Sequence, residues 1–300
     1  MTIISRPYNK EKDYERVSDF LVKTYSDKND FQNWHQPRWE YMHYHPYFYN
    51  EELQKIHDKI RIWEDDEKIV GVAHFEHTLG NCYIEIDKEY SDLQDEMVQY
   101  AEENLKGQSE GRSFLTFYVN EHNNQFKEIL KSRGYKNAKE YNEYMSVFET
   151  EKEFPEITLP EGFKLQSLED ENNLNKLHRV LWRGFNHGDE PDDDLSGRRL
   201  MQSAPNYRKD LNIVVVAPDG NYVSYCGMWY DDKNKFAYVE PVATDPDYRK
   251  MGLGKAAVLE GVRRCKELGA TKAYVATNKK FYLKIGFETI YTMEAWGKVF

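Results

Sequence analysis

The stretch EPVATDPDYRKMGLGKA, in the last quarter of the sequence, combines basic side chains with two closely spaced glycines. Arg249, Lys250 and Lys255 carry the positive charge. Gly252 and Gly254 stand where a helix would begin after an apolar strand. The first turn of a helix has unpaired backbone N–H groups and a partial positive charge, and glycines let an anion approach the main chain closely. The pattern therefore indicates a site for the phosphate groups of a ligand.

Two common phosphate-binding patterns fail at this turn. The dinucleotide pattern G-x-G-x-x-A fits GLGKAA formally, but it should begin directly at the end of a strand and be followed about 20 residues later by an acid. Here the charged segment TDPDYRKM precedes the glycines, and the next strand, KAYVAT, offers no acid. The Walker pattern fails because one residue separates the glycines and alanine follows Lys255.

A third pattern fits, and with it residues 240–287 resemble the GNAT superfamily of acyl-CoA-dependent N-acetyltransferases. The loop from Arg249 to Gly254 matches the pyrophosphate motif R/Q-x-x-G-x-G/A of that family, and FYLKIGF, residues 281–287, is similar to its terminal Y-x-K-x-G-F. The resemblance implies that acetyl-CoA is the acyl donor and that backbone groups hold it. The residues assigned to it are Val242, Ala243, Thr244, Arg249, Lys250, Met251, Gly252, Leu253, Gly254, Lys255 and Asn278.

Direct acyl transfer needs a base that takes a proton from the amine and an acid that protonates the departing thiolate. By the resemblance, Tyr282 is the acid; the alternative is a core tyrosine, since Phe281 and Phe287 indicate a buried segment. Glu240, on the cofactor strand, is the candidate base, with a solvated carboxylate at a strand end as the alternative. His187 is a further candidate in a loop, where a lone histidine more often faces solvent.

The elements that must position these residues occur twice in the same order. Apolar alternation and turn signals predict a series of strands and helices before the linker-like segment TEKEFPEITLPEG, residues 150–162, and a matching series after it. We predict a mixed α/β fold with two tandem GNAT domains, 1–150 and 151–300, each a mostly antiparallel, splayed sheet flanked by helices. Pro241 cannot donate to a sheet ladder and predicts a bulge or an unpaired edge, where the resemblance implies that the pantetheine arm enters.

The first domain contains a near-repeat of the opening turn without its useful residues. Aligning Tyr90 with Tyr248 places Gln94 and Glu96 opposite the two glycines. Pairing SRGY, residues 132–135, with KIGF, residues 284–287, places Leu130 opposite the candidate acid. Side chains there obstruct the approach of a phosphate, and the acids around them repel it. We therefore predict that one chain binds one acetyl-CoA, in the second domain only. The alternative is that the likeness is accidental and that the first half has another fold.

Composition and charge argue against several other classes of protein. The chain has 300 residues, of which 40% are hydrophobic, and a net charge of -11, which is unsuited to nucleic acid. Residues 249–300 nevertheless carry 11 basic and 4 acidic side chains, a local island that suits a small anion. Without a leader-like start or an apolar run of about 18 residues, we expect a cytoplasmic protein that is not membrane-bound. Cys82, Cys226 and Cys265 lack the spacing of a metal site or a disulfide framework.

Two further stretches leave alternatives open. Residues 33–49 are rich in aromatic side chains, and the spacing of His35, His43 and His45 matches no common zinc site. We interpret the stretch as an aromatic wall, either of the acceptor pocket or of the packing between the two halves. The acidic run DEPDDD, residues 189–194, is either a solvated loop or an attractor for a cationic amine.

The sequence thus predicts a metal-independent N-acetyltransferase that moves an acetyl group from acetyl-CoA directly to an amine of a small-molecule acceptor, with neither nucleic acid nor membrane as partner. A catalytically silent CoA-binding or interaction protein on the same fold is the first alternative. A nicotinamide oxidoreductase is the second.

Overall fold

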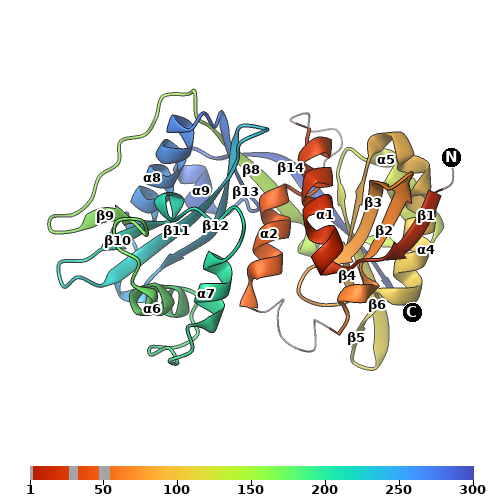
Figure 1. Ribbon diagram of the computed structural model, residues 1–300, viewed down its shortest axis with the longest axis horizontal. Helices are drawn as coiled ribbons and strands as arrows, with labels where there is room; N and C mark the ends of the chain where they lie inside the picture. Colours follow the sequence, from red (N-terminus) through yellow and green to blue (C-terminus); the bar gives the residue numbers. More distant parts are fainter. Residues whose placement is uncertain (1–2, 27–32, 47–54) are drawn as a thin grey trace. The chain divides into compact units, whose positions relative to one another are not determined.

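The computed structural model describes residues 3–26, 33–46 and 55–300. Its chain divides into two compact units (Figure 1). Unit 1 comprises Met1–Met145 and Ile290–Phe300, and unit 2 comprises Ser146–Thr289. The segment predicted to be a linker, residues 150–162, forms neither helix nor strand and lies within unit 2.

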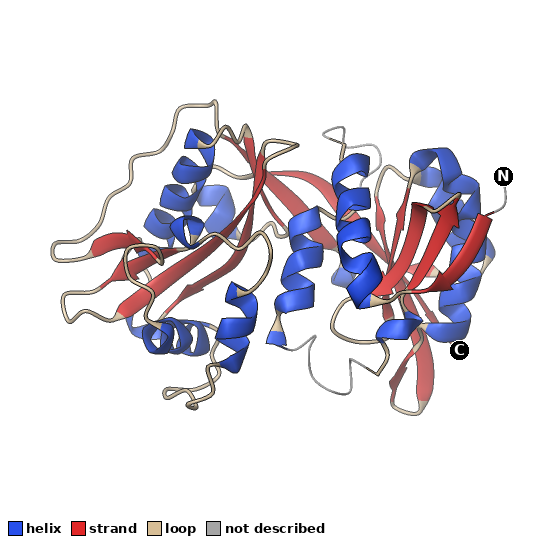
Figure 2. Cartoon of the chain, viewed as in Figure 1, coloured by secondary structure: helices blue, strands red, loops and turns tan. Residues whose placement is uncertain are grey.

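Unit 1 is a mostly antiparallel sheet with helices on both faces (Figure 2). Its strands lie in the order β1 (Ile3–Pro7), β2 (Arg61–Asp65), β3 (Lys68–Phe75), β4 (Asn81–Ile86), β6 (Arg112–Asn120) and β14 (Glu288–Val299), with β5 (Gly107–Ser109) paired to β6 and β7 (Lys136–Asn137) paired to β14. Its helices are α1 (Lys10–Thr24), α2 (Gln36–Tyr44), α4 (Gln94–Asn104) and α5 (Asn124–Ser132).

Unit 2 repeats this arrangement. Its strands lie in the order β9 (Lys164–Ser167), β10 (Ile213–Val216), β11 (Tyr222–Asp231), β12 (Phe236–Thr244), β13 (Lys272–Val275) and β8 (Glu143–Glu149). Its helices are α6 (Leu174–Gly184), α7 (Ser196–Gln202), α8 (Leu253–Glu267) and α9 (Lys280–Lys284). In each unit the fourth and fifth strands run parallel: β4 with β6, and β12 with β13. The mixed α/β sheet flanked by helices that the sequence predicts is present in both units.

The sixth strand of each unit lies on the other side of the predicted domain boundary at residue 150. In unit 1, β14 pairs with β6 through Met293–Val299, although most of unit 1 precedes residue 146. In unit 2, residues 146–149 of β8 pair with β13, although β8 precedes the linker. The predicted boundary at residue 150 assigns β8 to the first half and β14 to the second. In the structure the two strands are exchanged: β14 completes the sheet of unit 1, and residues 146–149 of β8 complete that of unit 2. Linker composition carries no information on which sheet a distant strand joins.

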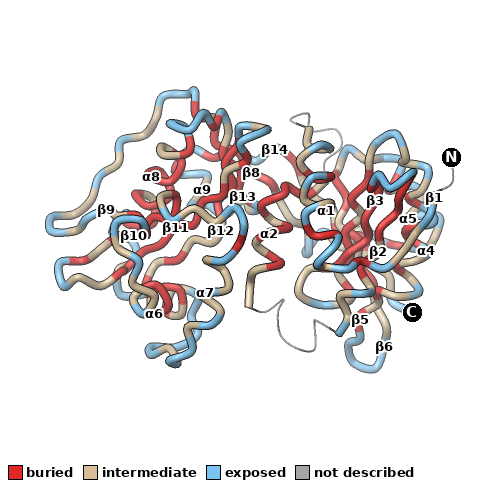
Figure 3. Tube along the Cα trace, in the orientation of Figure 1, coloured by how far each residue is buried: buried red, intermediate tan, exposed pale blue. Residues whose placement is uncertain are grey.

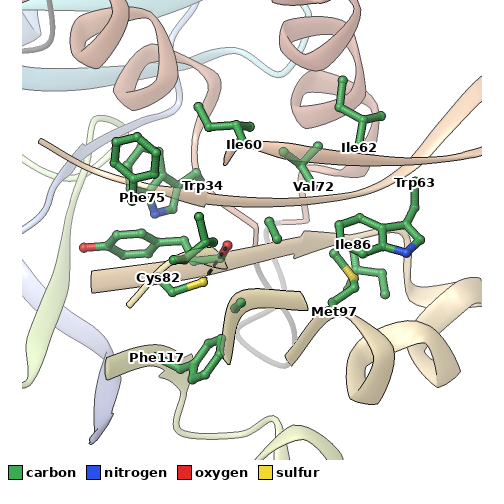
Figure 4. Packing of buried hydrophobic residues seen from close by; sticks show 14 of the residues in the cluster. Trp34, Ile60, Ile62, Trp63, Val72, Phe75, Cys82, Ile86, Met97 and Phe117 are labelled. Atoms are coloured by element: carbon green, nitrogen blue, oxygen red, sulfur yellow. Dashed lines mark hydrogen bonds between the residues drawn. The ribbon is translucent and has the colours of Figure 1, made fainter. Parts of the chain in front are cut away.

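Apolar side chains fill a core in each unit. Figure 3 marks in red the stretches of each unit where the residues are buried. In unit 1 the core includes Val72 of β3, Ile86 of β4 and Met97 of α4, all fully buried (Figure 4). In unit 2, α8 covers the face of the sheet that carries Cys226, while α6 covers the opposite face, which carries Tyr225. Among the residues that the structure describes, no helix is long and apolar enough to cross a membrane.

Candidate active site

Strands β12 and β13 separate in unit 2 and leave one edge of β12 exposed. Their parallel pairing joins Phe236–Tyr238 to Lys272–Tyr274, and within the described residues no β13 partner follows, although β12 continues to Thr244. On the other side, the register with β11 shifts where Gly227 faces Glu240 and Pro241. A Cβ on Gly227 would lie 2.6 Å from the carbonyl oxygen of Glu240, so only glycine fits there. The bulge predicted at Pro241 is confirmed.

The alternation of the ladder decides which backbone groups of β12 face this opening. The N–H of Asp245 donates to the carbonyl of Val223 at 3.0 Å, and Ser224 stands opposite Thr244 in the register. Because hydrogen-bonded positions alternate along an antiparallel pair, the peptide groups of Val242 and Thr244 point to the opposite edge. That edge can accept an extended ligand as an additional strand.

The loop that follows β12 presents unpaired backbone donors. A short 3-10 turn, Pro246–Tyr248, is capped by the side chain of Asp245. Helix α8 then begins at Leu253, and its N-cap residue, Gly252, has a φ of 82° and provides no side-chain cap. Lys250 also has a positive φ, of 67°. Among the described residues, no protein acceptor binds the N–H groups of residues 250–255. Such a group of donors at a helix N-terminus is suited to an anion.

Arg249 is bonded within the protein rather than presented to a ligand. Its Nε donates to the carbonyl of Thr244 at 3.2 Å, and its Nη2 donates to the carbonyl of Gly184 at 2.9 Å and to Oδ1 of Asn186 at 3.1 Å. Its backbone N–H donates to the carbonyl of Pro246 at 3.3 Å. The side chain of Arg249 therefore holds the loop against the end of α6.

Tyr282 and Glu240 lie near each other in unit 2. Tyr282 is half-buried in α9 and packs against Phe287, with ring centroids 5.6 Å apart. Burial raises the pKa of Tyr282, and the nearby Cys226 and Glu240 raise it further. Glu240 is half-buried, and its carbonyl accepts from Nε1 of Trp229 at 2.9 Å. At neutral pH the phenol is therefore protonated, as an acid requires, and Glu240, whose charge influences the pKa of the phenol, supplies a carboxylate that could serve as the base.

The other predicted residues occupy the same region of unit 2. Val242 packs on the α8 side of the sheet and Ala243 on the α6 side. Leu253 and Gly254 are buried in the first turn of α8, with Met251 exposed before them. Asn278 is half-buried between β13 and α9, Lys255 is half-buried, and His187 is exposed against Trp182.

The histidines of α2 belong to the core of unit 1. His43 is fully buried, where its Nδ1 lies 2.9 Å from the carbonyl of Trp39 and its Nε2 lies 3.0 Å from the hydroxyl of Tyr8. His35 is also buried. In the described parts of the chain, no group of three or more His, Cys, Asp or Glu side chains is arranged to hold a metal ion. The last residues of the predicted aromatic wall, 47–49, lie outside the described residues.

The turn in unit 1 that corresponds to the loop before α8 is built from different contacts. Asp87 caps it as Asp245 caps its counterpart, which supports the alignment of the two turns. Gln94, opposite the first glycine, is buried, and the acid opposite the second, Glu96, accepts from Nε1 of Trp63 at 2.8 Å. These side chains take part in the packing of unit 1.

The strands of unit 1 also diverge, but side chains fill the opening. Strands β4 and β6 pair at Asn81 and Cys82 only, within the described residues. Beyond that point the rings of Tyr83 and Tyr118 stack across the gap, with centroids 5.1 Å apart. The remaining cavity beside them measures about 20 Å³. That volume is suited to one water molecule rather than to a pantetheine arm.

Comparisons with known proteins define the class. Residues 174–287 match the model of the acetyltransferase (GNAT) family. Mycothiol acetyltransferase of Saccharomonospora viridis is 28% identical over 164 residues, which cover 49% of this chain and 53% of that protein, so the similarity spans about half of the relative. The GNAT resemblance that the sequence indicates is confirmed.

Two solved structures share the fold over nearly the whole chain. A GCN5-related N-acetyltransferase from Sphaerobacter thermophilus has a TM-score of 0.63 at 13% identity and covers 99% of this chain and 95% of its own. A tandem GNAT protein from the clavulanic acid biosynthesis pathway has a TM-score of 0.62 at 10% identity and covers 99% of this chain and 98% of its own. These likenesses confirm the predicted fold class of two tandem GNAT folds.

Proposed function

We propose that the protein is an N-acetyltransferase in which unit 2 moves an acetyl group from acetyl-CoA to an amine of a small-molecule acceptor. The observation that carries the proposal is the pairing of two features in unit 2. The edge of β12 at Val242 and Thr244 can hold the pantetheine arm as an added strand. The unpaired N–H groups of residues 250–255 can hold its diphosphate at the start of α8.

The residues at the opening supply the proton transfers that this reaction needs. Acetyl-CoA contributes the thioester from which the acetyl group leaves. Glu240 accepts a proton from the amine as its nitrogen bonds to the acetyl carbon, and Tyr282 donates a proton to the sulfur as the carbon–sulfur bond breaks. The raised pKa of Tyr282 keeps that proton available at neutral pH.

Unit 1 has a structural role in this proposal and binds no CoA. Its corresponding turn carries side chains where unit 2 has glycines, and the rings of Tyr83 and Tyr118 close its strand opening. The acceptor is a small molecule rather than nucleic acid, because the chain is acidic and its basic island is local.

Calorimetric titration with acetyl-CoA, followed by an assay of free thiol with an amine panel, tests the proposal. The panel comprises polyamines, aminoglycosides, amino acids and peptide N-termini. We expect one binding event and thiol release with at least one class of amine. Binding without release from any class would favour the silent CoA-binding alternative. Binding of NADH in place of acetyl-CoA would contradict the proposal and favour the oxidoreductase.

A further inference from the structure

A buried arginine in unit 2 joins three carboxylates from two different segments. Arg183, in the last turn of α6, is 7% exposed. Its Nε donates to Asp245 at 2.7 Å and its Nη2 donates to Asp247 at 2.7 Å. Its Nη1 donates to Asp189, at 2.9 Å to the carboxylate and 3.2 Å to the carbonyl. One guanidinium group therefore bonds to two segments. The first is the turn that begins residues 245–255, here called the cofactor loop, and the second is the α6–α7 segment, residues 185–195.

A second arginine, on the loop, also bonds the loop to the end of α6. Arg249 of the loop donates to the carbonyl of Gly184 and to Asn186, directly after Arg183. Gly184 permits this approach, because a Cβ there would lie 2.7 Å from the Cβ of Ala243 and 3.1 Å from the backbone nitrogen of Thr244. The two arginines thus form a reciprocal clamp.

The segment beyond Asp189 returns to the same helix. Oδ1 of Asp192 lies 3.3 Å from Nε2 of His178, and Nε of Arg198 donates to Nδ1 of the same histidine at 3.2 Å. The acidic run at residues 189–194 is therefore anchored on α6 through Arg183 and His178 rather than merely solvated. Since α6 also binds the cofactor loop, a restraint on that loop can reach the α6–α7 segment.

We propose that Arg183 is a positioning residue that couples the cofactor loop to the α6–α7 segment, so that CoA in the loop restrains residues 185–195. The inference rests on the proposed function, which places the diphosphate at residues 250–255. A bound diphosphate restrains the loop and the turn before it, and therefore Asp245 and Asp247. Arg183 passes this restraint to Asp189. Residues 185–195 are then held more firmly when CoA is bound than when it is absent.

Hydrogen exchange followed by mass spectrometry, with free CoA as the probe, tests this coupling in the full chain. In the wild type, saturating CoA should slow exchange in residues 245–255 and, by about fivefold or more, in residues 185–195, which is the low end of a typical coupling between sites. Arg183→Lys keeps a positive charge beside the buried Asp245 but has a single nitrogen, which cannot span the three carboxylates that Nε, Nη1 and Nη2 of the arginine reach. In this variant the slowing at residues 245–255 should remain and the slowing at 185–195 should be lost.

Two further variants keep the test decisive. Arg179→Lys is the matched control, because Arg179 donates to the same oxygen of Asp245 at 3.2 Å from one turn earlier in α6; it should behave as the wild type does. Asp189→Ala changes a side chain that is 94% exposed, so this variant should fold, bind CoA within about twofold of the wild type and show reduced slowing at 185–195.

Two outcomes would overturn the coupling. One is slowing at 185–195 as in the wild type in both Arg183→Lys and Asp189→Ala, and the other is a loss of that slowing in Arg179→Lys equal to the loss in Arg183→Lys. If CoA fails to slow residues 245–255 in the wild type, the proposed function itself fails.

Discussion

At the scale of the residue, Tyr282 provides the sharpest test of the proposed chemistry. Tyr282→Phe keeps the ring that packs against Phe287 and removes the proton donor. If the phenol protonates the leaving thiolate, kcat should fall by about 10² with little change in the KM for acetyl-CoA. Tyr230→Phe is the control, since the Tyr230 hydroxyl donates to the carbonyl of Leu268 instead. Unchanged turnover in Tyr282→Phe would assign Tyr282 to packing.

The raised pKa of Tyr282 predicts how the turnover of the wild type and of Tyr282→Phe should compare at different pH. Burial holds the pKa above its ordinary value, so the phenol stays protonated at neutral and moderately alkaline pH. The ratio of wild-type to Tyr282→Phe turnover should therefore be the same at pH 7 and pH 9. A ratio that falls towards one at pH 9 would show that the wild-type phenol loses its proton there.

Gly252 separates the effect of charge from that of backbone strain. Its φ of 82° favours glycine or asparagine, and a Cβ there would meet open space. Gly252→Asn is therefore a matched, neutral control for Gly252→Asp. The aspartate should be more stable than the asparagine variant by about 0.3–1 kcal/mol, because a carboxylate at a helix N-terminus is favourable. It should nevertheless bind acetyl-CoA more weakly, because it repels the diphosphate.

Thermal unfolding and calorimetric titration of the two Gly252 variants measure these opposite effects. Equal affinity of Gly252→Asp and Gly252→Asn for acetyl-CoA would argue against a diphosphate at this turn.

The role of Gly252 could be predicted from local patterns, since strand, loop and helix follow one another along the sequence. Local patterns could not predict Arg183, because its partners Asp245 and Asp247 lie about sixty residues further along the chain.

At the scale of the element, the approach of α6 to β12 depends on Gly184. Gly184→Ala would place its Cβ 2.7 Å from that of Ala243 and should lower the free energy of unfolding by about 1–3 kcal/mol, as overpacking does. Affinity for acetyl-CoA should fall as well, because Arg249 holds the loop to the carbonyl of Gly184. Denaturant unfolding and titration measure the two effects.

A second substitution tests whether the collision is the cause. Ala243→Gly removes the Cβ that Gly184→Ala would meet, so the double variant should recover part of both losses. A double variant whose loss of stability equals the sum of the two single losses would show that the two positions do not interact. The remaining contact, with the backbone nitrogen of Thr244, limits the recovery.

Strands and long helices could be predicted at this scale because their apolar periodicity is local, and the bulge at Pro241 because proline lacks a donor. Helix α2 could not, since it buries Gln36, Glu40 and His43 together with Trp39 and so shows no polar face. Gln36 donates to Glu40 one turn away, but His43 also contacts the hydroxyl of the distant Tyr8, and a pattern along the chain cannot reveal such a distant partner.

At the scale of the whole molecule, unit 1 depends on the far end of the chain for its last strand. Deleting residues 290–300 removes the strand that pairs with β6 through Met293–Val299. Hydrogen exchange in β6 should then accelerate strongly, even though the deletion lies far from β6 in sequence. Exchange in α8 of unit 2 is the internal control. Unchanged exchange in β6 would contradict the observed pairing.

The number of CoA molecules per chain must therefore be measured on the full chain, because a fragment of residues 1–150 would lack β14. We expect calorimetry to give one acetyl-CoA per chain, since Tyr83 and Tyr118 close the opening in unit 1 and Gln94 and Glu96 occupy its turn. Gly252→Asp distinguishes the two units, because it alters unit 2 alone. If unit 1 held a second site, that variant would retain one binding event of undiminished affinity. Two events in the wild type, or one event of undiminished affinity in Gly252→Asp, would show that unit 1 has kept a site of its own.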